Sequence, residues 1–268
     1  YDTVIPEYVD LGLSVKWATF NVGAKAPEEA GYFFAWGETT AKKSFSWNSY
    51  KWCNKTGTSM TKYCSIDEYG QVDNKITLDL EDDAAHVHWK EEWRIPTVAE
   101  CQELINNCKW ETITINGVSG IRGTSKIEGY TDNSIFLPSA GVNITNNVNF
   151  SGYFQTRELV SNESNSVYCM TSNSSSSSSA YIRSDLSRHY GYHVRPVYGA
   201  LSVSIPRVTT KVATQIRDHS ALVGGQVTHD GGCSVTEYGI VYSTHTSPTI
   251  DDNKHIASQG MGLFYHTL

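Results

Sequence analysis

The sequence has no long apolar run. No stretch approaches the roughly 18 consecutive apolar residues that a membrane-spanning helix needs. The chain also opens on residues 1–10, which have the pattern of a folded segment, rather than on a charged and apolar leader. These two absences predict a soluble chain.

Basic charge is also scarce. Lys and Arg number 21 against 28 Asp and Glu, the formal net charge is -7, and no run of Lys or Arg occurs. Proteins that bind nucleic acids neutralise phosphates with clustered basic side chains. The composition therefore argues against a nucleic-acid partner.

The six cysteines lack C-x-x-C spacing, so we expect no zinc site, no other metal and no cofactor. Cys101 and Cys108 lie on one predicted helix, separated by about 10 Å of axial rise, which is too far for a disulfide. We expect both, and Cys169, to be small buried side chains. Cys53 and Cys64 flank a polar loop, and they either pair in an oxidising compartment or stay free.

The length of 268 residues exceeds the roughly 100–200 residues of an average domain, so we expect two domains. The composition changes around residues 200–206, which predicts a first domain at 1–202 and a second at 203–268. Seven Trp and 16 Tyr stand against only three Met, with abundant Ser, Thr, Asn and Gly. Such a composition is common in exported, β-rich binding proteins.

Most of the first domain predicts short strands and loops. Residues 8–18 alternate around a glycine and predict a strand pair, and the aromatic run 31–37 predicts a buried strand. Residues 38–92 lose this periodicity, so we expect loops with short elements there. Further strands are predicted at 110–123, around an Asn-Gly turn, and at 134–138.

The clearest helix is predicted at 97–108. Thr97 and, three residues later, Glu100 form the pattern of a capping box, and apolar residues then repeat on one face. Arg94 and Glu100 also invite an acid–base role. Because Glu100 fits the capping box and Arg94 precedes the strand-to-helix corner, we expect both to be structural.

The second domain predicts only four short strands. They lie at 213–216, 222–228, 238–243 and 262–268. An immunoglobulin-like sandwich needs about seven. We therefore expect an incomplete sandwich with an exposed edge, and such an edge can accept a strand from a partner chain.

Five ordered segments resemble one protein family. They are YVDLGLSVKWATFNVGA at 8–24, GYFFAWGE at 31–38, WRIPT at 93–97 followed by Glu100, FLPSAG at 136–141 and GYHVRPV at 191–197. Together they resemble the Fibrobacter succinogenes major paralogous domain, over nearly all of residues 8–199. The resemblance implies a C-type-lectin-like fold of the formylglycine-generating-enzyme subclass, as found on surface proteins of Bacteroides-like bacteria.

Residues 205–268 separately resemble the immunoglobulin-like or fibronectin-type modules of such proteins, through GGQVT at 224–228 and VTEYGIVYS at 235–243. The expected fold class is therefore α+β: a C-type-lectin-like domain with a second, incomplete all-β immunoglobulin-like sandwich. The expected location is the outer cell surface or the secreted fraction.

The sequence gives little support for enzymatic or metal chemistry. Formylglycine-generating enzymes work through a reactive cysteine pair near the domain end, where this chain has only Cys169, so a degenerate enzyme of that type is kept only as the alternative. The sugar-binding calcium motifs of C-type lectins are absent.

His86 and His88 with 82–83 allow a metal cluster, but a polar loop edge is favoured because no third ligand can be placed. The acidic turn 251–253 is expected to be solvated.

Residues 151–198 predict the binding surface. They include a hairpin of 167–170 and 180–186 across a serine run, with Tyr, Arg, Asp and His in the interior of the segment. Tyr rings stack on sugars or fill protein pockets, and Arg and Asp direct hydrogen bonds. The expected ligand-binding residues are Tyr153, Gln155, Arg157, Tyr168, Tyr181, Arg183, Asp185, Arg188, His189 and Tyr190.

The predicted function is non-enzymatic recognition of a glycan or a protein through this face. An ordinary solvated hairpin is the plain alternative. A third possibility is a binding protein diversified by a retroelement, because residues 164–192 contain no Lys, Trp, Glu or Gln. Known segments of that kind usually end the protein, whereas further sequence follows here.

Overall fold

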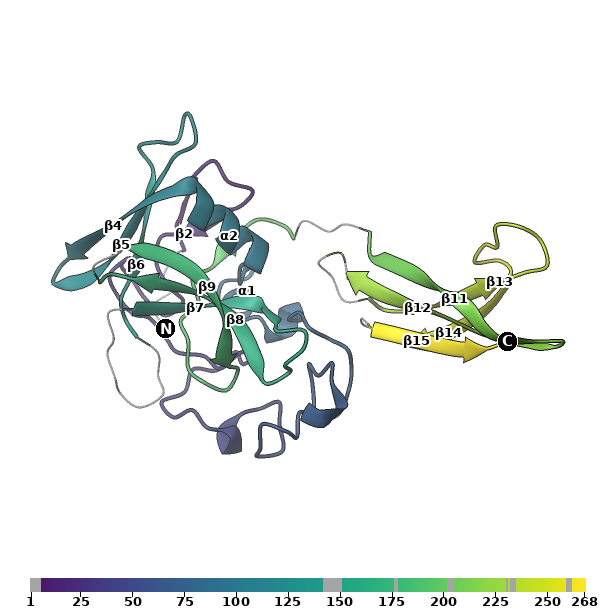
Figure 1. The fold of residues 1–268 in the computed structure, drawn as a ribbon. Helices are drawn as coiled ribbons and strands as arrows, with labels where there is room; N and C mark the ends of the chain where they lie inside the picture. Colours follow the sequence, from purple (N-terminus) through teal and green to yellow (C-terminus); the bar gives the residue numbers. More distant parts are fainter. Residues whose placement is uncertain are drawn as a thin grey trace.

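Strands dominate the computed structural model (Figure 1). It describes residues 6–141, 151–175, 178–201, 205–229, 231, 235–258 and 262–268. Strands take up 42% of the residues and helices 10%, and the strands form several small antiparallel sheets. The expected fold class, α+β with a lectin-like domain and an immunoglobulin-like sandwich, is therefore wrong. The sequence contains one strong helix pattern, and short paired strands occupy much of what lies outside the loops.

A four-stranded sheet joins distant parts of the chain. Its order is β1 (Tyr8–Val9), β2 (Lys16–Ala18), β10 (Val197–Tyr198) and β3 (Trp93–Arg94). The pairing of β1 with β2 confirms the strand pair predicted at 8–18. In this sheet, residues 197–198 lie between β2, from the beginning of the chain, and β3, from its middle.

Helix α2 (Val98–Asn107) begins where the sequence predicts. Thr97 accepts from the backbone N–H of Glu100, and the Glu100 carboxylate accepts from the backbone N–H of Thr97. Arg94 also donates to both carboxylate oxygens of Glu100, at 2.8 and 2.6 Å. The structural roles predicted for these residues are confirmed. No helix in the described ranges is long and apolar enough to cross a membrane.

Two three-stranded sheets pack near α2. One contains β4 (Cys108–Ile115), β5 (Val118–Ser125) and β6 (Ser134–Pro138), and the other contains β7 (Ser151–Leu159), β8 (Ser166–Asn173) and β9 (Ser179–Ser187). These confirm the Asn-Gly hairpin, the strand at 134–138 and the hairpin across the serine run. Residues 176–177 of that run lie outside the described residues.

The segment 38–92 consists mainly of loops, as predicted. It contains the short helices η1 (Trp47–Ser49), η2 (Asp67–Tyr69), η3 (Leu80–Asp82) and α1 (Ala84–Trp89). The aromatic run 31–37 is part of the core, since Phe34 and Trp36 are fully buried. It forms only an isolated bridge to Tyr192, however, and not the predicted strand.

Arg188 connects these loops to the rest of the molecule through hydrogen bonds. Its side chain is fully buried. Nε donates to the Tyr50 hydroxyl at 2.7 Å, and Nη1 donates to the carbonyls of Tyr63 and Ser164 at 2.7 and 2.8 Å. Nη2 donates to the Lys62 carbonyl at 3.2 Å. One guanidinium thus satisfies acceptors in two loops that lie far apart in the sequence.

Arg195 holds the N-terminal strands in the same way. It is fully buried, and Nε donates to Asn21 Oδ1 at 2.8 Å. Nη1 donates to the carbonyls of Ala18 and Thr19, each at 3.2 Å, and of Phe136 at 3.0 Å. Burial lowers the pKa of Arg195 to about 9, so the side chain is still charged at neutral pH.

Residues 205–268 form two further sheets. One contains β11 (Arg207–Arg217), β12 (Ser220–His229) and β15 (Gly262–Thr267), and the other β13 (Tyr238–Tyr242) and β14 (Asn253–Ser258). Sequence patterns missed β14, whose apolar residues are few. The structure shows small sheets here and not an immunoglobulin-like sandwich.

The cysteines described by the structure are all unpaired. Cys53 and Cys64 do not form the disulfide that the sequence left open. Cys101, Cys108 and Cys169 are buried, as predicted. Cys233 lies outside the described residues.

We expect Arg188→Met to lower the free energy of unfolding by about 3 to 5 kcal/mol, because it leaves several buried acceptors without a donor. Urea denaturation followed by tryptophan fluorescence measures this effect. All seven Trp lie between residues 17 and 110, so the signal reports on the part of the chain that Arg188 holds.

Arg122→Ala is the matched control. Arg122 forms an exposed ion pair with Glu111, and its loss is expected to cost less than about 1 kcal/mol. Equal destabilisation by the two substitutions would contradict the role assigned to Arg188.

Candidate functional site

The edge strand β9 exposes a tyrosine and an ion pair. Tyr181 is 41% exposed. Arg183 Nε and Nη2 donate to the two carboxylate oxygens of Asp185 at 2.8 and 2.6 Å. These hydrogen bonds raise the pKa of Arg183 and lower that of Asp185. A bidentate pair of this kind holds donors and acceptors in a fixed plane.

A cluster of tilted aromatic rings lies at the turn after β9. The ring centroid of His189 is 4.1 Å from that of Trp47 and 4.4 Å from that of Tyr190. The Ser187 hydroxyl is 2.7 Å from His189 Nδ1. Burial, and then the charge of Lys42, lower the pKa of His189 to about 4. The imidazole is therefore neutral at physiological pH, and the cluster carries no charge.

Tyr192 lies behind the turn that follows β9. Its ring is fully buried, its hydroxyl donates to the Ser187 carbonyl at 2.8 Å, and its ring centroid is 6.5 Å from that of Tyr190. Burial raises the pKa of Tyr192. We call the following group the tyrosine surface: Trp47, Tyr181, Arg183, Asp185, His189 and Tyr190.

Half of the residues predicted to bind a ligand are buried. They are Tyr153, Gln155, Arg157, Arg188 and His189. Gln155 Nε2 donates to the Phe34 carbonyl at 2.6 Å, and Arg157 donates to the Leu78 carbonyl. These polar side chains hold the interior together, so a ligand cannot reach most of them without rearrangement. Tyr168 is partly exposed on β8, and the other four belong to the tyrosine surface.

Sequence patterns missed the contribution of residues 45–47 to the site. Trp47 belongs to the loop segment 38–92, which has no periodicity that would place it beside His189. Its neighbour Phe45 lies against Gly191, where a Cβ would be only 2.5 Å from the Phe45 ring. A side chain at position 191 would therefore displace the Phe45 ring.

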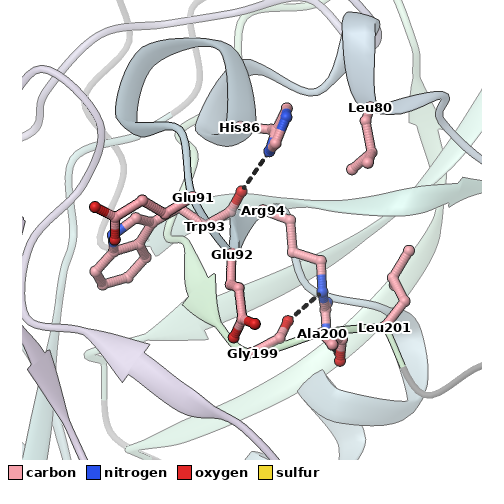
Figure 2. A pocket seen from close by; sticks show the side chains of 9 residues that line it. All are labelled: Leu80, His86, Glu91, Glu92, Trp93, Arg94, Gly199, Ala200 and Leu201. Carbon is pink, nitrogen blue, oxygen red and sulfur yellow. Dashed lines mark hydrogen bonds between the residues drawn. The ribbon is translucent and has the colours of Figure 1, made fainter.

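A pocket of about 340 Å³ opens beside β3 (Figure 2). It is lined by Leu80, His86, Glu91, Glu92, Trp93, Arg94, Gly199, Ala200 and Leu201. The N–H groups of Arg94 already have acceptors, because Arg94 pairs with Glu100 and donates to the carbonyls of Gly199 and Ala200. The lining includes the imidazole of His86 and the carboxylates of Glu91 and Glu92 but no hydroxyl or thiol. The arginine of the pocket has a structural role.

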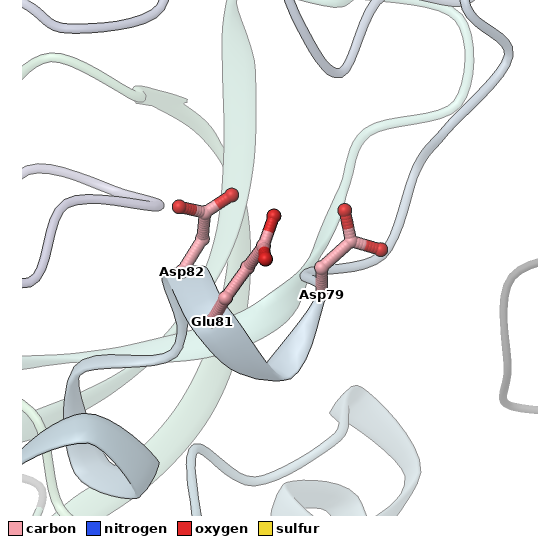
Figure 3. A group of neighbouring side chains, drawn as sticks. All are labelled: Asp79, Glu81 and Asp82. Carbon is pink, nitrogen blue, oxygen red and sulfur yellow. The ribbon is translucent and has the colours of Figure 1, made fainter.

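Three carboxylates cluster at η3 (Figure 3), in the group Asp79, Glu81 and Asp82. Lys62 Nζ lies 2.8 Å from Asp79, 2.7 Å from Asp82 and 3.4 Å from Glu81. Burial alone would raise the pKa of Asp79, but hydrogen bonds from Lys62 and Lys75 more than offset it and lower the pKa to about 2. An ammonium group thus occupies the place where a cation would bind.

The histidines weighed as metal ligands have other partners. They lie on helix α1 and not on a strand, with Asp83 accepting from the backbone N–H of His86 as the helix cap. His86 Nδ1 is 3.3 Å from the Trp93 carbonyl, and His88 Nε2 is 2.9 Å from the Thr39 carbonyl. The polar loop edge favoured from the sequence is therefore wrong for these residues, which form a short helix instead.

The turn at 251–253 is held by internal hydrogen bonds. Asp252 Oδ1 is 2.8 Å from His245 Nε2, and Asp252 Oδ2 accepts from the Thr249 backbone N–H at 2.8 Å. Both carboxylate oxygens therefore have partners in the turn itself.

Comparison with protein-family models, with curated proteins and with solved structures finds no match. The functional argument for this chain therefore depends on its own residues.

We expect Lys62→Met to lower the free energy of unfolding at pH 7 by about 1 to 3 kcal/mol, because it removes the cation from a half-buried acidic cluster. The folded-state pKa of Asp79, about 2, lies below its ordinary value of 3.8. The stabilisation is thus fully present above pH 3.8 and is lost as the pH falls through 2. Urea denaturation between pH 7 and pH 3 should show the difference from wild type shrinking at the acid end.

Lys109→Met serves as the control, since Lys109 is exposed on β4 and forms no ion pair among the described residues. A difference for Lys62→Met that stays constant down to pH 3 would show that the cluster does not depend on this cation.

Proposed function

We propose that the chain is a non-enzymatic recognition protein that binds a neutral carbohydrate at the tyrosine surface. The observation that carries this proposal is the exposed Tyr181 on the same strand as the bidentate Arg183–Asp185 pair, with half-buried Tyr190 in the turn that follows this strand. Aromatic faces stack on the C–H faces of sugar rings, and paired charged groups hydrogen-bond to neighbouring hydroxyls. The same pair is neutral as a unit, which favours an uncharged ligand.

The surface is supported from behind by a rigid interior. Tyr192 is fully buried behind it and hydrogen-bonds to the turn that carries His189 and Tyr190. Arg188, adjacent in sequence to His189, is fixed by its hydrogen bonds to four residues. A surface held in one arrangement loses less entropy on binding.

Catalysis is not supported by the geometry of the same residues. Ser187 and His189 are hydrogen-bonded, as a nucleophile and its base would be. Among the described residues, however, no carboxylate is hydrogen-bonded to His189, so the pair lacks the third member that orients a catalytic histidine. Arg183 and Asp185 neutralise each other and are exposed, which suits contact and not proton transfer.

An extracellular location is part of the proposal. The composition is rich in Tyr, Trp, Ser and Asn, as is common in exported, β-rich binding proteins. The abundant Ser and Asn adapt their hydrogen bonds to a ligand, and Tyr provides contact area at low entropic cost.

We expect Tyr181→Ala and Arg183→Ala each to weaken carbohydrate binding by about tenfold or more, because truncating a central aromatic or arginine contact typically costs over 1.4 kcal/mol. A glycan array identifies the bound sugar, and titration calorimetry with that sugar measures the affinity of each variant. An immobilised panel of candidate host proteins, screened in parallel, tests for a protein ligand.

Tyr265→Ala and Arg122→Ala are matched controls, because both side chains are exposed and lie on other sheets. If neither Tyr181→Ala nor Arg183→Ala weakens carbohydrate binding, the assignment of the site is wrong. Binding to a protein alone would replace the carbohydrate as ligand.

A further inference from the structure

Strand β11 leaves large apolar side chains in solvent. Val208 is 60% exposed, Val212 87% and Ile216 73%. Of the eleven residues of the strand, only Ala213 is partly buried. Several large apolar side chains exposed along one strand are a feature of interaction surfaces.

The register shows why β11 is uncovered. Val208 pairs with Val227, and Thr210 pairs with Gly225, which in turn pairs with Phe264. These residues share one face of the sheet, and Val227 and Phe264 are buried on it. The Tyr238 ring of β13, 4.9 Å from Phe264, covers this face over the neighbouring strands. The apolar layer therefore continues onto β11, where the cover ends.

The opposite face of β11 carries positive charge. Lys211, Thr214 and Arg217 pair with residues at alternate positions of β12, so all three point to that face. Within the described residues, neither cation forms an ion pair. The sequence from 205 to 217 also contains three basic residues and no Asp or Glu. The strand thus combines an apolar side with a basic side.

We propose that β11 docks an extended segment of another polypeptide in which apolar residues alternate with acidic ones. The apolar side chains pack beside Val208 on the uncovered core face, and the acidic ones meet Lys211 and Arg217 on the other. Docking along an exposed strand is a common mode of peptide recognition. Regular pairing with the β11 backbone is confined to 208–211, because β-bulges follow and Gln215 has a φ of 50°.

Charge also argues against a second copy of the chain as the occupant. Two β11 strands side by side would bring Arg207, Lys211 and Arg217 of one copy near the same cations of the other. Like charges on adjacent strands repel. An acidic segment instead neutralises cations that have no partner within the described part of the chain.

The test uses the full chain and a dye-labelled, end-blocked synthetic peptide in which valine alternates with glutamate. Fluorescence anisotropy should show binding that weakens at high salt, and little binding of the same peptide with lysine in place of glutamate. The double variant Lys211→Glu/Arg217→Glu should bind the glutamate peptide about tenfold more weakly and should prefer the lysine peptide.

Lys254→Glu is the matched control, since Lys254 is an exposed lysine on β14 and its substitution changes charge in the same region. Val208→Asp should weaken binding of the glutamate peptide and leave the circular dichroism spectrum of the protein unchanged. Equal binding of both peptides, or no binding of either, would overturn the proposal. So would sedimentation velocity showing self-association that Val208→Asp abolishes, because a second copy would then cover β11.

Discussion

The buried guanidinium of Arg188 is the interaction on which the first part of the chain depends. It lies over the Trp36 ring, 5.0 Å from its centroid, and donates to acceptors from residues 50–63 and to Ser164. A charge taken out of water is tolerated only when its hydrogen bonds are nearly all satisfied. The loops must therefore adopt the one arrangement that surrounds this group with oxygen atoms, which also brings Trp47 beside His189.

Arg195 also joins distant parts of this region, although its Nη2 has no hydrogen-bond partner among the described residues. Its partners lie in residues 18–21 and at Phe136, so one side chain joins the early strands to β6. Regular strand pairing is short here: β1, β3 and β10 have two residues each. Side-chain hydrogen bonds from buried arginines replace part of the backbone ladder that longer strands would supply, and such networks specify a single packing.

Local patterns in the sequence predicted local structure well. The capping box of Thr97 and Glu100 and the hairpin turn at 116–117 depend on neighbours in the chain, and both occur as predicted. Arg157 and Arg188 were expected on a binding surface because arginine directs hydrogen bonds to a ligand. Their burial depends on carbonyl groups far away in sequence, such as that of Leu78, which no local pattern reveals. The same holds for the contact between Trp47 and His189.

Apolar side chains are mostly buried in the first part of the chain and exposed on β11. The two parts therefore offer different chemical groups at their surfaces. In the first part, tyrosines such as Tyr192 are buried behind others that are exposed, so buried rings support the surface proposed to bind a carbohydrate. On β11, Val212 and its neighbours are exposed, so the segment proposed to dock there would bury apolar side chains that are now in solvent. The proposed carbohydrate site thus offers hydrogen-bonding groups beside an aromatic ring, whereas the proposed docking strand offers apolar and cationic side chains. These two kinds of surface would suit different classes of ligand.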